Sequence, residues 1–155
     1  TIGAGKIWLE IYTSDDWRDW IPYAVAHEYY HSVWTDLQYT EHPIKDLVDY
    51  LVFEGRADSF AHLIYPDVHA PWTEVLTPES EVTQWRVMQP YLHNDSIIIQ
   101  RKFIFGQYEV PRWTGYTIGF HIVQSYLQKH PDVTVDEWTM IEAHDLLDES
   151  GYSGK

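Results

Sequence analysis

Two histidines and a glutamate within residues 26–32 have the types and the spacing of a metal site. His27 and His31 are four positions apart, so on a helix both imidazoles point from one face toward a single metal ion. Glu28, one position further round, can reach a water molecule bound to that ion. Two neutral imidazoles and an oxygen ligand suit zinc, and a catalytic zinc site keeps one coordination position open for water. The HExxH pattern therefore predicts a zinc site.

The motif needs a helix, and the residues around it support one. Pro22 suits a first helical turn, and no helix-breaking residue lies between it and His27. Val33 and Leu37 continue an apolar pattern at helical spacing after the motif. We therefore expect a helix from about Pro22 to Tyr39. The alternative is a surface helix that carries two incidental histidines.

A third protein ligand has to come from elsewhere in the chain. In the metzincin continuation of the motif a glycine and a third histidine follow, but Trp34 and Leu37 occupy those two positions. Glu54 and Asp58 lie four positions apart on the next expected helix, which otherwise faces a core. Carboxylates are rarely buried without a partner. A metal ion would supply a partner for Glu54, and a metal-bound histidine would supply one for Asp58.

Composition limits the class of protein and its partners. The chain has 155 residues, 45% of them hydrophobic, and no cysteine, which fits a single domain over residues 1–155 without disulfides. A net charge of −14 argues against nucleic acid or an anionic membrane as a partner. No apolar run approaches the ~20 residues that span a membrane.

The chain begins at Thr1 and not at Met, so we interpret it as a piece of a longer protein that lacks an N-terminal region. No signal peptide is visible. The compartment therefore stays unknown, with the cytoplasm slightly favoured.

The elements expected around the metal helix are mostly helical. Before it, over Ile7–Tyr12, every second residue is an isoleucine or a leucine. This alternation predicts an edge strand that can pair with an extended peptide. The segment 97–105 is ambiguous between a short buried helix and a strand, although three successive isoleucines favour a strand. The expected class is therefore α+β, mostly helical, with a small sheet that precedes the HExxH helix. Further helices are expected at about 44–65, 77–90, 116–129 and 134–150.

The pair of carboxylates after the motif resembles the gluzincins, the thermolysin-like zinc peptidases. Four segments together look like the YjaZ-like family of predicted zinc-dependent proteases, with this chain as the C-terminal, catalytic part. The segments are AHEYYH at 26–31, EGRAD at 54–58, GYTIG at 115–119 and SGY at 150–152. The resemblance implies a zincin-like metallopeptidase domain, one catalytic Zn²⁺ ion, and a peptide or protein as the substrate.

The same resemblance implies a role for each residue of the site. His27, His31 and Glu54 become the ligands of the zinc ion. Glu28 becomes the general base, which deprotonates the metal-bound water and later protonates the leaving amine. Asp58 becomes the hydrogen-bond partner that orients one of the ligand histidines.

Gluzincins also use a hydrogen-bond donor to the oxyanion, usually a tyrosine or a histidine from a later element. Tyr116 is the candidate here, since Gly115 and Gly119 beside it permit close backbone approach. His121 is the alternative donor, and an ordinary core aromatic is the alternative interpretation of Tyr116.

Two functions from different classes are compatible with these residues. The leading hypothesis is a gluzincin-type zinc metallopeptidase that hydrolyses peptide bonds. The alternative is a non-hydrolytic, zinc-stabilised module that binds a peptide or protein on a zincin scaffold. Glu28 favours the enzyme, because a degenerate peptidase would commonly have lost its base or a ligand. Hydrolysis of a non-peptide amide also stays open, as do the natural substrate, the cleavage preference and the oligomeric state.

Overall fold

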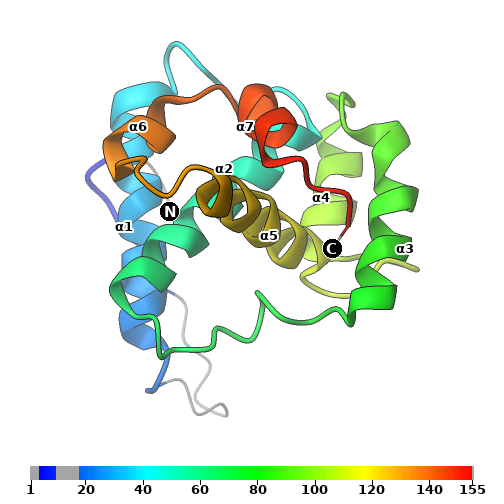
Figure 1. The fold of residues 1–155 in the computed structure, drawn as a ribbon, viewed down its shortest axis with the longest axis horizontal. Helices are drawn as coiled ribbons and strands as arrows, with labels where there is room; N and C mark the ends of the chain where they lie inside the picture. Colours follow the sequence, from blue (N-terminus) through cyan, green and yellow to red (C-terminus); the bar gives the residue numbers. More distant parts are fainter. Residues whose placement is uncertain (1–3, 10–17, 155) are drawn as a thin grey trace.

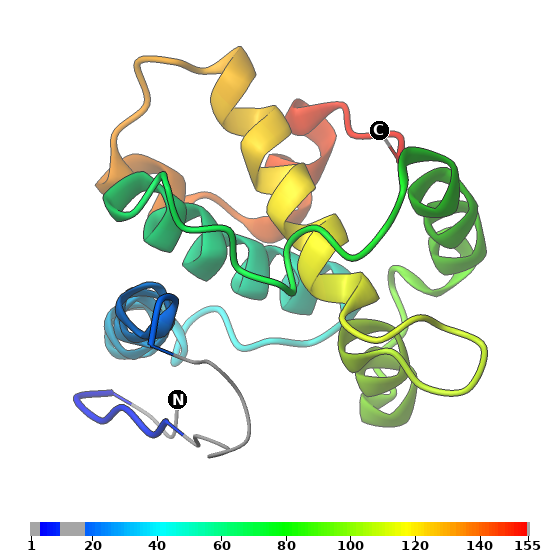
Figure 2. The same ribbon diagram turned by 90° about the horizontal axis from the view of Figure 1, so that it is seen from below.

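A computed structural model describes residues 4–9 and 18–154, and helices account for the secondary structure of this part of the chain. Helix α2 lies at the centre, with α1 on one side and α5 crossing it on another (Figures 1 and 2). The shorter helices α4 and α7 pack against both α2 and α5. The helices are α1 (Ile21–Gln38), α2 (Leu47–Ile64), α3 (Pro78–Met88), the 3₁₀ turn η1 (Gln89–Tyr91), α4 (Ile97–Phe105), α5 (Thr114–Lys129), α6 (Val135–Met140) and α7 (Ala143–Ser150).

The predicted edge strand is wrong, and with it the α+β class. Residues 4–9 and 18–154 contain no strand or sheet, and residues 10–12 of the expected strand lie outside the described residues. Ile7, Trp8 and Leu9 are 41%, 66% and 37% exposed, so their alternation buries no face against a sheet. An apolar alternation stabilises a strand only when a partner strand and a covered face are available. The expectation of a mostly helical domain agrees with the structure.

Helix α2 is the core of the fold because it is buried on nearly all sides. Leu47, Leu51 and Val52 are fully buried, and a capping box between Asp46 and Asp49 begins the helix. A helix surrounded in this way can carry polar groups only where each finds a partner. The buried polar side chains of α2 are therefore candidate functional residues.

Two glycines set the distance between α2 and α5. A Cβ atom added to Gly55 would lie 2.1 Å from the carbonyl oxygen of Gly119, and one added to Gly119 would lie 2.3 Å from that of Leu51. The two backbones are therefore in direct contact at this crossing. Gly119 was expected to permit close approach of the backbone, and its partner is α2.

The structure decides one assignment that the sequence left open and corrects one further expectation. Residues 97–105 form α4 and not a strand, because Phe103 and Ile104 are both buried in the same core cluster, where consecutive strand residues would face opposite sides. The single helix expected at 134–150 is two helices, since Ile141 has an extended backbone with φ −64° and ψ 142°. The carbonyl oxygen of Ile141 accepts a hydrogen bond from Nη2 of Arg56, which holds this break against α2.

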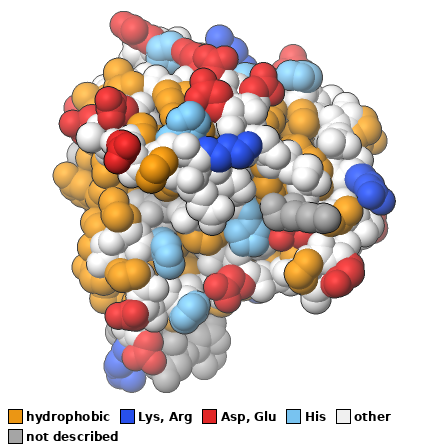
Figure 3. Space-filling view, viewed as in Figure 1, with side chains coloured by type: hydrophobic (Ala, Val, Ile, Leu, Met, Phe, Trp, Pro, Cys, Tyr) orange, Lys and Arg blue, Asp and Glu red, His pale blue; other side chains and the backbone are white. Residues whose placement is uncertain are grey.

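The surface reflects the composition. Acidic side chains outnumber basic ones on the face in Figure 3, and hydrophobic side chains gather at its left edge, over α1 and α6. Tyr29, Leu37 and Met140, from these two helices, are 53%, 58% and 58% exposed. None of the helices in the described part of the chain has the length and the apolar composition needed to cross a membrane.

Candidate metal centre

Helix α1 presents His27 and His31 toward α2. Their Nε2 atoms are 3.0 Å apart, and the two rings are perpendicular, with centroids 4.5 Å apart. Both side chains are buried, 6% and 3% exposed. The four-residue spacing produces this arrangement because such residues stack on one side of a helix. Both ring nitrogens can therefore face a single ion.

Helix α2 brings Glu54 to the same point. Its Oε2 atom is 3.1 Å from Nε2 of His31 and 3.3 Å from Nε2 of His27. Around a tetrahedral zinc ion with bonds of about 2.0–2.1 Å, ligand atoms are about 3.3–3.4 Å apart. The three donor atoms thus form a triangle close to the size that one zinc ion requires.

A second carboxylate lies behind His27. Asp58, one turn after Glu54 on α2, accepts a hydrogen bond from Nδ1 of His27 at 2.8 Å. The same Oδ1 atom accepts a second bond, at 2.8 Å, from Nε1 of Trp72. Asp58 is 0% exposed. Because Nδ1 of His27 donates to Asp58, its Nε2 atom can direct a lone pair toward His31 and Glu54.

The charges of Glu54 and Asp58 favour the binding of a cation. Glu54 and Asp58 are both buried, and in the part of the chain that the structure describes their ion pairs are with histidines only. Two neutral imidazoles leave the group with two uncompensated negative charges, which is costly in a protein interior. A divalent ion between the three donor atoms would neutralise both charges. The donor set of two nitrogens and one oxygen fits zinc.

In the metal-free protein a proton takes part of this role. Burial lowers the pKa of His27, but Asp58, together with Glu54, outweighs burial and raises it to about 10. Burial raises the pKa of Glu54, but His31 and His27 outweigh it and lower the pKa to about 2. Burial lowers the pKa of His31, whose Nδ1 atom has no partner among the described residues. A proton on His27 therefore partly compensates the two carboxylates.

An open cavity of about 610 Å³ lies in front of these donor atoms. Glu28 is half-buried at its edge, next to His27 in the chain. Tyr116, at the start of α5, also borders the cavity, with its ring centroid 6.3 Å from that of His27. Burial, with the charge of Glu54, raises the pKa of Tyr116 well above its ordinary value, so its hydroxyl stays protonated and can donate.

His121, the alternative donor, lies elsewhere on α5. Its Nδ1 atom is 2.7 Å from Oε1 of Glu81, and it borders cavities that do not contain His27 or Glu54. The structure thus brings Tyr116, but not His121, into the cavity of the candidate centre.

Sequence reasoning missed two residues that shape the centre. Trp72, in the loop between α2 and α3, holds Asp58, and nothing in the sequence distinguishes it from the other seven tryptophans. Gly55 allows α5 to approach α2 beside Glu54, and its place inside an apolar helix was a detectable signal.

A second group of possible ligands lies at the surface. Asp46, His93 and His144 bring one ligand atom each within 4.8 Å of one another. The side chain of His93 is 80% exposed, whereas all three residues of the first group are buried. The buried group is therefore the stronger candidate for a catalytic ion.

Comparisons with known proteins agree with this site at the level of the family. No solved structure matches the chain. The chain is 27% identical over 144 residues to the uncharacterised protein YjfC of Bacillus subtilis (strain 168), an alignment that covers 84% of this chain and 47% of YjfC. The chain thus spans about half the length of that relative. Residues 3–148 match the family model described as "Predicted Zn-dependent protease (DUF2268)". The chain therefore belongs to the DUF2268 family of predicted zinc-dependent proteases.

Proposed function

We propose that residues 1–155 form a catalytic domain that hydrolyses peptide bonds with one zinc ion held by His27, His31 and Glu54. The observation that carries the proposal is the convergence of three buried donor atoms, 3.0–3.3 Å apart, at the floor of an open cavity. The family description supports zinc and proteolysis, and the roles of individual residues are the proposal's own.

When bound at such a centre, zinc lowers the pKa of water to about 7 and polarises a carbonyl group. Glu28 accepts the proton of the attacking water and passes it to the leaving amine. Tyr116 donates a hydrogen bond to the oxygen of the scissile carbonyl as negative charge develops there. Asp58 keeps the proton of His27 on Nδ1 and fixes the orientation of its ring.

The peptide itself would lie in the cavity and not along a strand, since the expected edge strand is absent from the described residues. Tyr50, Phe53 and Phe105 form an aromatic part of the cavity wall, which suits an apolar side chain of a peptide. Phe53 also stacks on His31, with ring centroids 3.9 Å apart, so it couples this wall to the donor atoms.

The test is a peptide-library cleavage assay combined with zinc analysis, on the wild type and on Glu28→Gln. The variant keeps the shape of the side chain and removes the base. We expect it to bind one equivalent of zinc while hydrolysis falls by at least ~10²-fold, the lower end of what a positioned base contributes. Tyr116→Phe should lower kcat by about 10²–10³-fold with little change in KM. Glu41→Gln and Tyr108→Phe, at exposed positions, are the matched controls.

Two outcomes would count against the proposal. Equal hydrolysis by the wild type and Glu28→Gln would reject the assigned base. Zinc binding and peptide binding without hydrolysis by the wild type, across a broad library, would instead favour the zinc-stabilised binding module.

A further inference from the structure

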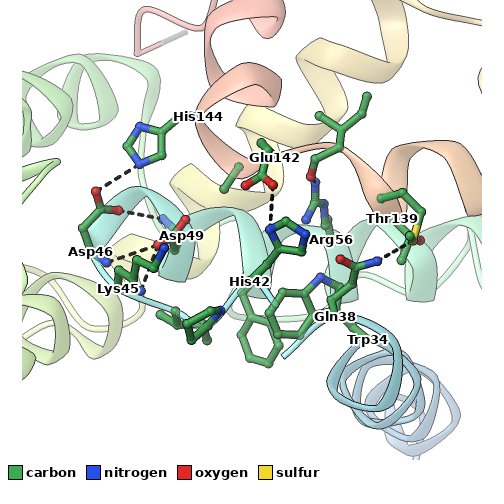
Figure 4. Close-up of a pocket in the computed structure, with 16 residues that line it drawn as sticks. Trp34, Gln38, His42, Lys45, Asp46, Asp49, Arg56, Thr139, Glu142 and His144 are labelled. Carbon is green, nitrogen blue, oxygen red and sulfur yellow. Dashed lines mark hydrogen bonds and ion pairs between the residues drawn. The ribbon is translucent and has the colours of Figure 1, made fainter. Parts of the chain in front are cut away.

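A second cavity, of about 270 Å³, lies between α1, the start of α2 and the link between α6 and α7 (Figure 4). At about 30 Å³ for each water molecule in the liquid, it is far larger than the space for one bridging water. Trp34 and Arg56 belong to its wall, whereas His42, Glu142 and His144 are half-exposed or more exposed and form its polar rim. We name it the Arg56 cavity.

Arg56 is an unusual residue for a helix interior. It is 3% exposed, and its one hydrogen bond among the described residues is the bond from Nη2 to the carbonyl oxygen of Ile141. Its Nε atom is buried without a partner, and no carboxylate of the described residues forms an ion pair with it. A buried guanidinium is normally paired with an anion, because removal of its hydration is costly.

A second unpaired donor belongs to the same cavity wall. Nε1 of Trp34 is also buried without a partner in the described part of the chain, and Trp34 comes from α1, one turn after His31. Two residues that line a single cavity, one of them charged, thus each have a buried N–H donor without an acceptor among the described residues. Their natural ligand is an anionic group with at least two acceptor oxygens.

The acidic residues that line the cavity are already engaged. Oδ2 of Asp49 accepts bonds from the backbone N–H groups of Lys45 and Asp46, at 2.9 and 3.3 Å. Oδ2 of Asp46 is 3.0 Å from Nε2 of His144, and Oε1 of Glu142 is 2.6 Å from Nδ1 of His42 (Figure 4). These carboxylates lower the potential around Arg56 without satisfying its donors.

The Arg56 cavity is next to the candidate centre. Ile44 and Phe53 border both cavities, and the ring of Phe53 also stacks on His31. A group bound in the Arg56 cavity would therefore share part of its wall with the cavity of the candidate centre. A peptide that occupies one cavity can therefore extend a side chain or a chain end toward the other.

We propose that the Arg56 cavity binds a carboxylate group of the peptide substrate, which accepts hydrogen bonds from Arg56 and Trp34. The carboxylate has two possible sources, the side chain of an aspartate or glutamate and the free C-terminus of the peptide. The inference rests on the proposed function for the identity of the ligand as a peptide. The inference predicts that peptides with a carboxylate bind more tightly, although the net charge of −14 by itself repels anionic peptides.

The test measures peptide binding and not turnover, with zinc-loaded Glu28→Gln as the host so that peptides stay intact. Short fluorescent peptides are compared in pairs, glutamate against glutamine at each position in one arm, and a C-terminal acid against a C-terminal amide in the other. We expect one arm to show about 10–100-fold tighter binding of the carboxylate peptide, the range expected for charge-assisted hydrogen bonds. The arm that shows it identifies the source.

Added variants assign that preference to the cavity. Arg56→Gln should abolish it, Arg56→Lys should retain part of it, and Arg86→Gln, at an exposed position on α3, should leave it unchanged. If circular dichroism shows that Arg56→Gln is unfolded, Trp34→Phe decides, because it removes one donor and keeps an aromatic ring, and it should weaken the preference.

Several results would overturn the inference. One is equal binding of the two peptides of every pair in both arms, and another is the absence of any peptide binding. A third is a carboxylate preference that survives in Arg56→Gln. Cleavage by the wild type without a carboxylate preference would overturn the inference and leave the proposed function standing. A carboxylate preference lost in Arg56→Gln, with no cleavage by the wild type, would support the inference and count against the proposed function.

Discussion

Replacing Asp58 with asparagine tests whether the charge behind His27 strengthens metal binding. Asparagine has nearly the same shape, and its amide oxygen can still accept the bonds that Asp58 receives at 2.8 Å from His27 and from Trp72. The substitution therefore removes one buried negative charge and leaves the two donors paired. Asp58→Ala would not separate these effects, because it leaves two buried N–H donors without an acceptor, at about 1–3 kcal/mol each.

The expected loss follows from the position of Asp58. A hydrogen-bond partner of a ligand histidine typically contributes 10–100-fold to metal affinity, which is about 1.4–2.7 kcal/mol. With Asp58 fully buried and the imidazole held by one oxygen, we expect Asp58→Asn to weaken zinc binding within this range. Asp58→Ala should lower the free energy of unfolding by about 2–6 kcal/mol, the sum for its two orphaned donors.

The assay is competition for zinc with a chromophoric chelator, with denaturant unfolding of the same samples. Asp67→Asn, at an exposed position after α2, is the matched control for an Asp-to-Asn change. Wild-type zinc affinity in Asp58→Asn, with the fold intact, would refute the electrostatic reasoning and leave Asp58 as a structural acceptor for Trp72.

Two further predictions concern protons and packing. In the metal-free protein the pKa of His27 is raised to about 10, so zinc must displace one proton when it binds. Apparent zinc affinity should therefore rise about tenfold per pH unit between about pH 7 and 9. Chelator competition at several pH values measures this, and a flat profile would contradict it. Gly119→Ala places a Cβ atom 2.3 Å from the carbonyl oxygen of Leu51 and should lower the free energy of unfolding by about 1–3 kcal/mol or more, measured by denaturant unfolding against Ser125→Ala on the same helix.

The tertiary structure decided the secondary structure of two segments whose local patterns favoured a strand. The alternation over Ile7–Tyr12 predicted a strand, but no described strand pairs with its described part and no sheet covers it. Ile7, Trp8 and Leu9 therefore stay exposed. The three isoleucines from Ile97 favoured a strand, yet the segment packs as α4 against α5, because burial of Phe103 and Ile104 in one cluster outweighs β-propensity.

What the sequence by itself determined is the local part of the site. Helical periodicity placed His27 and His31 on one face of α1, and the same rule placed Glu54 and Asp58 one turn apart on the next helix. Whether these two pairs meet depends on how α1 packs on α2, and no spacing along the chain specifies that. Only the packed structure brings Oε2 of Glu54 to 3.1 Å from His31.

Trp72 and Arg56, which lie around the site, could not be predicted from the sequence for the same reason. Trp72 contacts Asp58 and Arg56 lines a cavity because of contacts between distant segments, and both residue types are ordinary at the level of composition. A hydrogen bond acts only over about 3 Å, so which distant residues share one depends on the final packing of the chain. Local periodicity determines which residues share a face, and tertiary packing determines which faces meet.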